Sequence, residues 1–203
     1  MTTTVVLATR NEHKVVEFRR ILAAASLDVE LLGVDSFPNV PEVPETAATF
    51  AENASAKARE VAQHSGHISI ADDSGLCVDA LNGMPGVLSA RWCGRHGDDA
   101  ANTALVLAQM SNVPAERRGA RFHCSAAVSL VDGTCQVVAA ALEGTLATMP
   151  IGEHGFGYDP IFVPDGEVRT TAQMKPQEKD QISHRGRALR ALVPVLESIL
   201  QQK

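Results

Sequence analysis

The sequence has few cysteines and no long apolar run, and each shortage excludes a class of protein. Its four cysteines lie 16, 31 and 11 residues apart without a C-x-x-C pair, which argues against a disulfide scaffold and a structural zinc site. The longest aliphatic run, Val137 to Leu142, has six residues, whereas a membrane-spanning helix needs about 20. The N-terminus has no basic region before its short apolar stretch. We therefore expect no secretory signal, a cytoplasmic location and reduced, mostly buried thiols.

Positive charge is scarce overall and absent from one part of the chain. Among 203 residues, 18 Lys and Arg face 24 Asp and Glu, a formal net charge of −6. No Lys or Arg occurs between Ile21 and Ala56, which contain six acids, whereas Lys175 to Arg190 carry five cations and two acids. The negative charge repels nucleic acid, so we expect no nucleic-acid partner and no membrane partner. An acidic cluster beside separate basic groups suits a metal-bound polyphosphate.

The composition and periodicity predict a single globular domain, 1–203, of the α/β class with a mixed sheet. Hydrophobic residues make up 45% of the chain and charged residues 21%, values typical of globular proteins. Apolar periodicity, caps and turn residues predict the following elements: strands Thr4–Thr9, Asp28–Val34 and Ile68–Ala71, the last resuming at Leu76–Ala80 after a break at Ser74-Gly75; helices after Asn11, over Phe50–His64 and over Asp98–Met110; a hairpin of Ala120–Val131 and Thr134–Leu146 joined by the two residues Asp132-Gly133; and a last helix capped by Ser183.

The first candidate site is the segment Thr9-Arg10-Asn11-Glu12-His13-Lys14, at a turn from strand to helix. Free backbone N–H groups and the helix dipole favour an anion there, with Lys14 one turn inside the helix. The alternative is that Asn11 only caps the helix and Lys14 is solvated. There is no Walker A sequence and no Gly-x-Gly-x-x-Gly, which excludes ordinary P-loop and Rossmann sites.

The second candidate is Asp72-Asp73-Ser74-Gly75, directly after a predicted strand. Neighbouring strand side chains point to opposite faces, so the two carboxylates need not share a role. One of them can bind a divalent ion or take a proton from water, and the alternative is a polar turn. Asp73-Ser74-Gly75 also matches the motif of aspartic proteases, whose dyad needs a second copy in the chain or from a partner subunit, and this chain has no second copy.

Three further groups of residues suit a nucleotide ligand. Glu45 precedes a helix on which Asn53 and Lys57 are spaced to face the same way, although an exposed helix face is the simpler interpretation. Gly155-Phe156-Gly157-Tyr158-Asp159-Pro160 can stack a base, or can be a surface loop pinned by a buried aromatic. Lys179 with Ser183-His184-Arg185-Gly186 offers hydrogen-bond donors, and the alternative is ordinary capping by a solvated basic turn.

In this order the motifs closely resemble the inosine triphosphate pyrophosphatase family, the Ham1-like enzymes. The resemblance extends from Thr4 to about Arg190 and also includes Thr49-Phe50 before Glu52-Asn53-Ala54 and Pro85-Gly86 with Ser89-Ala90-Arg91. It implies an elongated mixed sheet flanked by helices, with two lobes around a central cleft. It also implies a homodimer that requires Mg²⁺ and hydrolyses dITP, ITP and XTP to the monophosphate and pyrophosphate.

The resemblance also implies roles for individual residues. Asp73 becomes the general base and a metal ligand, Ser74 a substrate contact, and Thr9, Asn11, Lys14 and Lys57 the holders of the triphosphate, within a substrate-binding set that also takes in Arg10, Glu12, His13 and Asn53. The groups that surround the purine are Phe156, Gly157, Tyr158, Asp159, Lys179, His184 and Arg185. Donors such as Arg185 or His184 suit the 6-oxo group of hypoxanthine and reject the amine of adenine.

One position departs from the family pattern. Many relatives carry two adjacent acids before the Thr of the proline-rich loop, whereas this chain has Pro44-Glu45, so Glu45 is a less secure second metal ligand than Asp73. Two other functions stay open on the sequence alone. One is a non-catalytic nucleotide-binding regulator, and the other is a pyrophosphatase for modified pyrimidine or standard nucleoside triphosphates.

Overall fold

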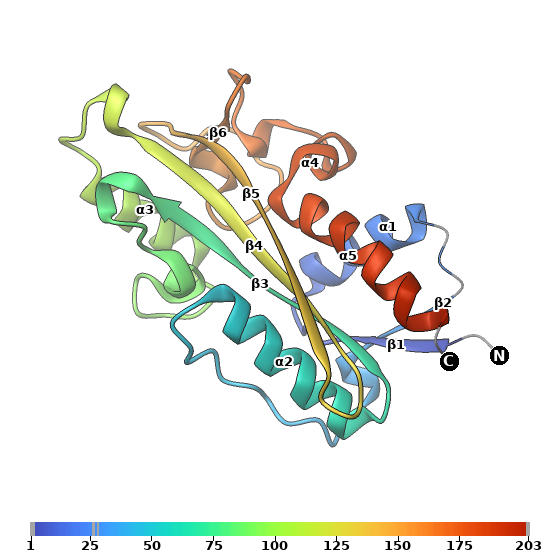
Figure 1. The fold of residues 1–203 in the computed structure, drawn as a ribbon. Helices are drawn as coiled ribbons and strands as arrows, with labels where there is room; N and C mark the ends of the chain where they lie inside the picture. Colours follow the sequence, from blue (N-terminus) through green and yellow to red (C-terminus); the bar gives the residue numbers. More distant parts are fainter. Residues whose placement is uncertain (1–2, 26, 28, 202–203) are drawn as a thin grey trace. The chain divides into compact units, whose positions relative to one another are not determined.

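The fold is a mixed α/β architecture built on one six-stranded sheet. A computed structural model describes residues 3–25, 27 and 29–201. The strand order is β2-β1-β3-β4-β5-β6, and β1 pairs parallel with β2 and β3 whereas β5 pairs antiparallel with β6 (Figure 1). The strands are β1 (Thr3–Leu7), β2 (Val29–Gly33), β3 (Ile68–Val78), β4 (Gly119–Ser129), β5 (Cys135–Leu146) and β6 (Phe162–Pro164). The predicted α/β class with a mixed sheet is confirmed.

The chain divides into two compact units, each assembled from separate segments. Unit 1 comprises Met1–Asp73, Cys124–Ala140 and Arg185–Lys203, and unit 2 comprises Ser74–His123 and Ala141–His184. Strands β3, β4 and β5 each contribute residues to both units. The predictions of a single domain and of a central cleft remain predictions.

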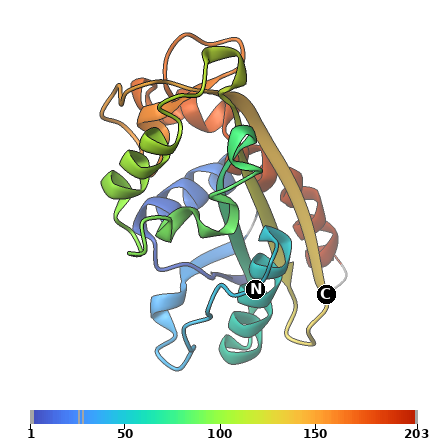
Figure 2. The ribbon, with the colours of Figure 1, turned by 90° about the vertical axis from the view of Figure 1, so that its left-hand side faces the viewer.

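In unit 1, helices cover both faces of the strands. The α-helices of the chain are α1 (Glu12–Ala24), α2 (Phe50–Ser65), α3 (Asp99–Gln109), α4 (Pro176–Ile182) and α5 (His184–Gln201). Phe18 of α1 and Leu189 of α5 pack with Leu7 and Ile70 in one buried cluster. Ala58 of α2 packs with Val6 and other residues of the opposite face in a second cluster. Figures 1 and 2 show α2 on one side of these strands and α1 with α5 on the other.

Local signals set the ends of the first two helices as predicted. The Asn11 side chain accepts a hydrogen bond from the Lys14 amide at 3.2 Å and caps α1. Thr49 and Glu52 form a reciprocal capping box at the start of α2, which ends at Gly66 in the left-handed conformation at φ +73°. The predicted first strand and both helices are confirmed. Asp28, the expected start of the second strand, lies outside the described residues.

Unit 2 has its own core, which Arg118 closes at one end. Residues from β3, α3, β4, β5 and the segment 158–162 form this apolar cluster, with Met110, Phe122 and Phe162 among its members. The buried Arg118 guanidinium donates to the carbonyl oxygens of Met110, Leu146 and Ala147, each at 2.8 Å. It thereby caps the C-terminal end of α3 against the end of β5.

The predicted break at Ser74-Gly75 is wrong, because β3 is continuous from Ile68 to Val78. Gly75 is needed for close packing rather than for a turn. A Cβ atom at Gly75 would overlap the Ser89 side chain and the carbonyl oxygen of Gly86. The Ser89 hydroxyl oxygen accepts a hydrogen bond from the Leu76 amide at 2.9 Å and donates to Gly86 O at 2.6 Å. Strand β3 therefore passes within contact distance of the Gly86–Arg91 segment, a 3₁₀ turn.

Gly75→Ala is expected to lower the free energy of unfolding by about 1–3 kcal/mol, because the backbone oxygen of Gly86 cannot move as a flexible side chain can. Gly33→Ala is the matched control, since no atom lies within 4 Å of a Cβ added at Gly33. Urea unfolding of the two variants measures the difference. Equal midpoints would contradict the close-packing explanation.

The β4–β5 hairpin forms, but five residues, 130–134, separate its strands instead of the predicted two. The Leu130 amide donates to Thr134 O at 2.9 Å, and the Gly133 amide donates to Leu130 O at 3.1 Å. Among the loop residues only Gly133 has a positive φ, +87°. The two-residue type I′ turn requires positive φ at both central residues, so the chain instead makes a turn closed by a single left-handed glycine.

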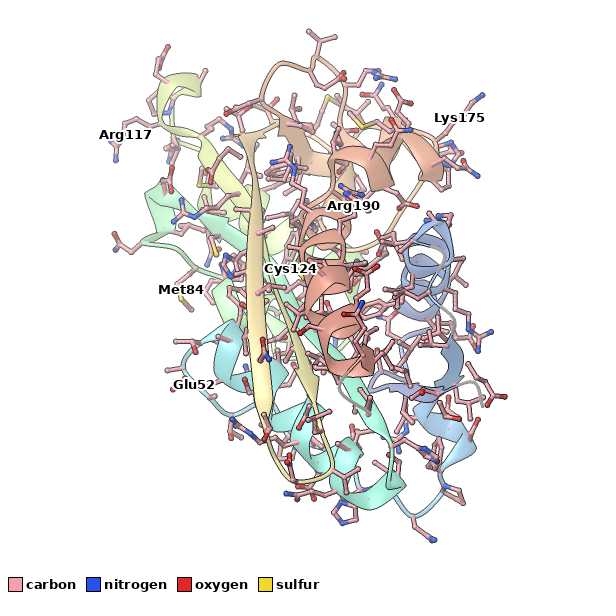
Figure 3. All side chains as sticks on the ribbon, turned by 45° about the vertical axis from the view of Figure 1, so that its right-hand side comes forward. Glu52, Met84, Arg117, Cys124, Lys175 and Arg190 are labelled. Carbon is pink, nitrogen blue, oxygen red and sulfur yellow. The ribbon has the colours of Figure 1, made fainter. Side chains whose placement is uncertain are left out.

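Other differences concern short elements and the thiols. Helix α4 and strand β6 were not predicted, and each has fewer than eight residues. All four cysteines are free, as expected, but only Cys124, labelled in Figure 3, is buried, whereas the other three are half-buried. The expectation of mostly buried thiols is therefore wrong. In the described part of the chain no helix is long and apolar enough to cross a membrane.

Candidate active site

The two neighbouring aspartates of β3 contact different sets of cations. Asp72, whose side chain is 0% exposed, lies 3.0 Å from Lys14 Nζ and 3.1 Å from Arg185 Nε. Asp73 accepts a hydrogen bond from Asn53 Nδ2 at 2.9 Å and lies 3.6 Å from Lys57 Nζ. The alternation of side chains along a strand explains why adjacent carboxylates have separate partners.

The environment of Asp72 keeps it ionised. Burial by itself raises its pKa, but the charges of Lys14 and Arg185 outweigh burial, so the pKa of Asp72 lies well below its usual range. The Arg185 guanidinium also donates to Glu17, and its pKa is raised above the usual value by Glu17 and Asp72 against the effect of burial. Lys14, Glu17, Asp72 and Arg185 thus form one buried charge network in unit 1.

The environment of Asp73 has the opposite effect on its pKa. Burial, together with the charge of the nearby Glu45, raises the pKa of Asp73 to about 6 against the opposing effects of Lys57 and Asn53. Lys57 Nζ donates to Glu45 Oε1 at 2.6 Å, so one ammonium group serves both carboxylates. Burial lowers the pKa of Lys57, but Asp73, Asp72 and Glu45 together raise it above the usual value. A carboxylate with a pKa near neutrality is suited to accept a proton from water.

The turn before α1 is ordered by its own side chains. The Asn11 amide donates to Thr9 Oγ1 at 3.2 Å, and Asn11 itself caps the helix. Arg10 pairs with Asp35 at 3.5 Å and donates to the Val40 carbonyl. Glu12 is exposed in the first turn, and the side chain of His13 lies outside the described part of the chain. The capping role of Asn11 is compatible with anion binding, because a helix N-terminus offers further N–H groups.

In unit 2, the aromatic loop Gly155–Asp159 is built around a buried carboxylate. Asp159 accepts hydrogen bonds from Phe156 N at 2.9 Å, Thr171 Oγ1 at 2.8 Å and Lys179 Nζ at 2.6 Å. Lys179 Nζ also lies 5.3 Å from the centre of the Phe156 ring, within the range of a cation–π contact. Gly155 has a φ of +78°, and a Cβ atom there would collide with the Asp159 carboxylate.

Tyr158 anchors this loop, and Phe156 is its half-exposed aromatic. Tyr158 is buried in the core of unit 2 and donates from its hydroxyl to Ser89 O at 2.8 Å. Burial, followed by the charge of Asp99, raises the pKa of Tyr158 above its usual range. The loop is therefore held by a buried aromatic residue, Tyr158, and its other aromatic residue, Phe156, is half-exposed beside Lys179.

The remaining site residues of unit 2 are Ser74 and His184. Ser74 is half-buried on β3. His184 is buried and stacks on Phe122, with ring centres 4.8 Å apart and planes 14° apart. Unit 1 holds the other predicted site residues: the segment 9–14, Glu45, Asn53, Lys57, Asp73 and Arg185.

Sequence reasoning missed Glu17 in the charge network and Asp99, whose Oδ2 accepts a hydrogen bond from Gly157 N at 2.7 Å. Glu17 had one detectable signal. It lies three residues after Lys14 and directly before Phe18, on the buried side of α1. Asp99 had none, because an acid in the first turn of a helix is common on electrostatic grounds alone.

Two lysines beside two strand carboxylates in an α/β fold, Lys14 at Asp72 and Lys57 at Asp73, are typical of a protein that binds phosphate groups. The model of the Ham1 family matches residues 5–195, and the chain belongs to the Ham1 family. It is 56% identical to the dITP/XTP pyrophosphatase of Streptomyces coelicolor over 198 residues, which cover 98% of this chain and 99% of that protein.

Two solved structures share the fold. The crystal structure of the nucleoside-triphosphatase, or dITP/XTP pyrophosphatase, of Mycobacterium abscessus matches with a TM-score of 0.78 and 55% identity, covering 95% of this chain and 100% of the other. The HAM1 protein of Coxiella burnetii matches with a TM-score of 0.88 and 39% identity, covering 97% and 100%. The resemblance inferred from the motifs is confirmed.

Proposed function

We propose that this protein is a dITP/XTP pyrophosphatase, which hydrolyses non-standard purine nucleoside triphosphates to the monophosphate and pyrophosphate. Membership of the Ham1 family and the identity to the Streptomyces coelicolor enzyme support this activity. The observation in this chain that carries the proposal is Asp73, a buried carboxylate with a pKa of about 6 that shares Lys57 with Glu45.

The reaction assigned to unit 1 is attack of water on the anhydride between the α and β phosphates. Asp73 takes the proton from the attacking water, because its pKa leaves most of it ionised at pH 7 while it stays basic enough to accept a proton. Lys14 and Lys57 bind phosphate oxygens and offset part of the about four negative charges of a nucleoside triphosphate. Asn53 holds Asp73 in place through its 2.9 Å hydrogen bond.

Asp73 and Glu45 fit a magnesium ion. Both carboxylates lie on the same ammonium group, Lys57 Nζ, so the pair already surrounds one positive charge. Among the described residues no group of three or more His, Cys, Asp and Glu side chains is placed to hold a metal. Magnesium needs only one or two carboxylates when substrate phosphates and water complete its shell. When bound, Mg²⁺ supplies charge that polarises the phosphate oxygens.

The base-binding role falls to the aromatic loop of unit 2. Phe156 offers a ring for stacking, and Lys179 supplies a donor beside it. His184, which stacks on Phe122, is a further donor assigned by resemblance. A protein N–H group that donates a hydrogen bond to a 6-oxo group would face the 6-amino group of adenine. The amino group is also a donor, so neither group would have an acceptor. The proposed specificity for hypoxanthine and xanthine over adenine follows from that difference. Arg185 belongs to this set by resemblance, while its guanidinium lies on Asp72 and Glu17.

Pyrophosphate release from a panel of nucleoside triphosphates tests the function. We expect dITP, ITP and XTP to yield monophosphate and pyrophosphate with Mg²⁺, and little product after chelation. Release of single phosphates, or equal turnover of ATP, would contradict the proposal. Binding of dITP without turnover would favour the non-catalytic regulator.

We also propose that the protein is a cytoplasmic homodimer. Sedimentation tests the oligomeric state, and cell fractionation tests the location.

Lys14→Ala is expected to raise the KM for dITP about tenfold or more, because Lys14 offers its ammonium group beside the helix N-terminus. The melting temperature should also fall, because Asp72 loses one of its two cations, but it should fall less than in a variant that removes Arg185, which serves both Asp72 and Glu17. Arg19→Ala removes one exposed cation from the same helix and serves as the control. Steady-state kinetics and melting curves decide the matter, and a collapse of stability with an unchanged KM would make Lys14 structural.

A further inference from the structure

Helix α3 forms hydrogen bonds with Gly157, the central residue of the aromatic loop of unit 2. Gly157 N donates to Asp99 Oδ2 at 2.7 Å, and Gly157 O accepts from Thr103 Oγ1 at 3.3 Å. Both polar backbone groups of Gly157 are therefore bound by a helix that lies more than 50 residues earlier in the sequence. Figure 2 shows α3 in yellow-green beside orange segments of the chain.

The loop needs such an anchor because of its glycines. Gly155 and Gly157 have φ values of +78° and +62°, and glycine reaches many other conformations at little cost. Phe156, the half-exposed ring of the loop, lies between these two residues. Its direction therefore depends on what holds the peptide on either side of it. The Asp159 carboxylate accepts a hydrogen bond from Phe156 N, and the Asp99 carboxylate accepts one from N of the next residue, Gly157.

Asp99 stands on a rigid support. The preceding residue, Asp98, caps α3 by accepting from Ala101 N at 3.0 Å, so the Asp99 carboxylate is not required as a cap. Asn102 accepts from Cys93 N at 2.8 Å and donates to Ala90 O, which ties the first turn of α3 to the preceding segment. Farther along, Val106 and Met110 lie in the core of unit 2.

We infer that Asp99 is a positioning residue for base recognition, which acts by fixing the Gly157 peptide and thereby the Phe156 ring. The inference rests on the proposed function, because it assumes that Phe156 meets the purine. The hydrogen bond to a carboxylate is of the strong, charge-assisted kind. Loss of this hydrogen bond allows the loop many conformations, of which only a fraction can stack a base. The apparent affinity is then the intrinsic affinity multiplied by that fraction.

The test compares Asp99→Ala and Asp99→Asn with Asp98→Asn. Asp99→Asn keeps an oxygen that can accept from Gly157 N. Asp98→Asn removes an acid from the same helix end but keeps an oxygen that can cap α3 by accepting from Ala101 N. Asp99→Ala should raise the KM for dITP about tenfold and leave kcat within about twofold, because the groups proposed to act on the phosphates are in unit 1. Asp99→Asn should restore much of the affinity.

Two further readouts separate positioning from general stability. Inhibition by pyrophosphate, which lacks a base, should be the same in wild type and Asp99→Ala. The Gly157 amide should exchange its hydrogen faster in Asp99→Ala than in Asp98→Asn. An unchanged KM in Asp99→Ala, or equal rises in KM in the Asp98 and Asp99 variants, would overturn the inference.

Failure of the proposed function can be told apart from failure of this inference. If the wild-type protein releases no pyrophosphate from any triphosphate, the proposed function is wrong. Calorimetric binding of inosine monophosphate then decides the role of Asp99. Weaker binding by Asp99→Ala than by Asp98→Asn supports positioning of the loop, and equal binding by the two variants overturns it.

Discussion

Asp73→Asn is expected to lower kcat for dITP by about 10²–10⁴-fold, the usual contribution of a general base. The substitution keeps the shape of the side chain and an oxygen for the Asn53 hydrogen bond, but it removes the group that accepts the proton. A further loss is expected because Asp73 is also proposed to hold Mg²⁺. Single-turnover pyrophosphate release measures the effect, and near-wild-type turnover would end the assignment.

The same variant should be more stable than wild type at neutral pH in the absence of divalent metal. The pKa of Asp73 is raised to about 6 in the folded protein, so the fold favours its protonated form. The stabilisation that this form contributes is fully present below the unfolded pKa, near 4, and is lost as the pH rises through 6. An uncharged Asn avoids that loss. In a chelating buffer the melting temperatures of variant and wild type should therefore agree below about pH 4, diverge between about pH 4 and 6, and differ by a constant amount above that.

Asp72→Asn is the control, and its stability should change in the opposite direction. The pKa of Asp72 is lowered by Lys14 and Arg185 against burial, so its charge stabilises the fold above the ordinary pKa of an aspartate, and this contribution is lost as the pH falls. The variant should melt lower than wild type at pH 7, with the deficit shrinking in acid. Near-zero turnover in Asp72→Asn alone would exchange the roles of the two aspartates.

The features that could be predicted from the sequence are those that depend on neighbours along the chain. Asn11 and the Thr49–Glu52 pair cap their helices through contacts three residues away, and such contacts are visible as spacings. Gly75 reads locally as a strand break. Its real role depends on Ser89, which packs against β3 from another segment, and no local pattern contains that information.

The same distinction applies to the candidate site. Motifs identified Asp73, Lys57 and Glu45, and the structure brings these three together. The partners that give neighbouring carboxylates different pKa values are distant in sequence. Asp72 meets Arg185 across 113 positions, and Arg185 meets Glu17 across 168. Only the fold reveals that Arg185, assigned by resemblance to the purine, is also a counterion to two buried acids.

Arg185→Met is expected to be the most destabilising of these substitutions, costing about 3–5 kcal/mol of unfolding free energy. The Arg185 side chain is only 3% exposed and serves both Glu17 and Asp72. Methionine occupies a similar volume but leaves two buried carboxylates with fewer partners. The penalty should shrink as the pH falls, because the pKa of Asp72 is held down partly by Arg185 and protonation of Asp72 removes the unpaired charge.

A double variant shows whether the cost comes from unpaired charge. Glu17→Gln combined with Arg185→Met should be more stable than Arg185→Met alone, because one buried negative charge has gone with its partner. Urea unfolding of the single and double variants gives the coupling, and additive effects would contradict a network.

The ratio of kcat/KM for ITP and ATP, measured on the same proteins, tests the role assigned by resemblance. If Arg185 also binds the 6-oxo group, the ratio of kcat/KM falls in Arg185→Met and stays low in the double variant. If the ratio instead recovers in the double variant together with the stability, Arg185 affects base recognition only through the fold.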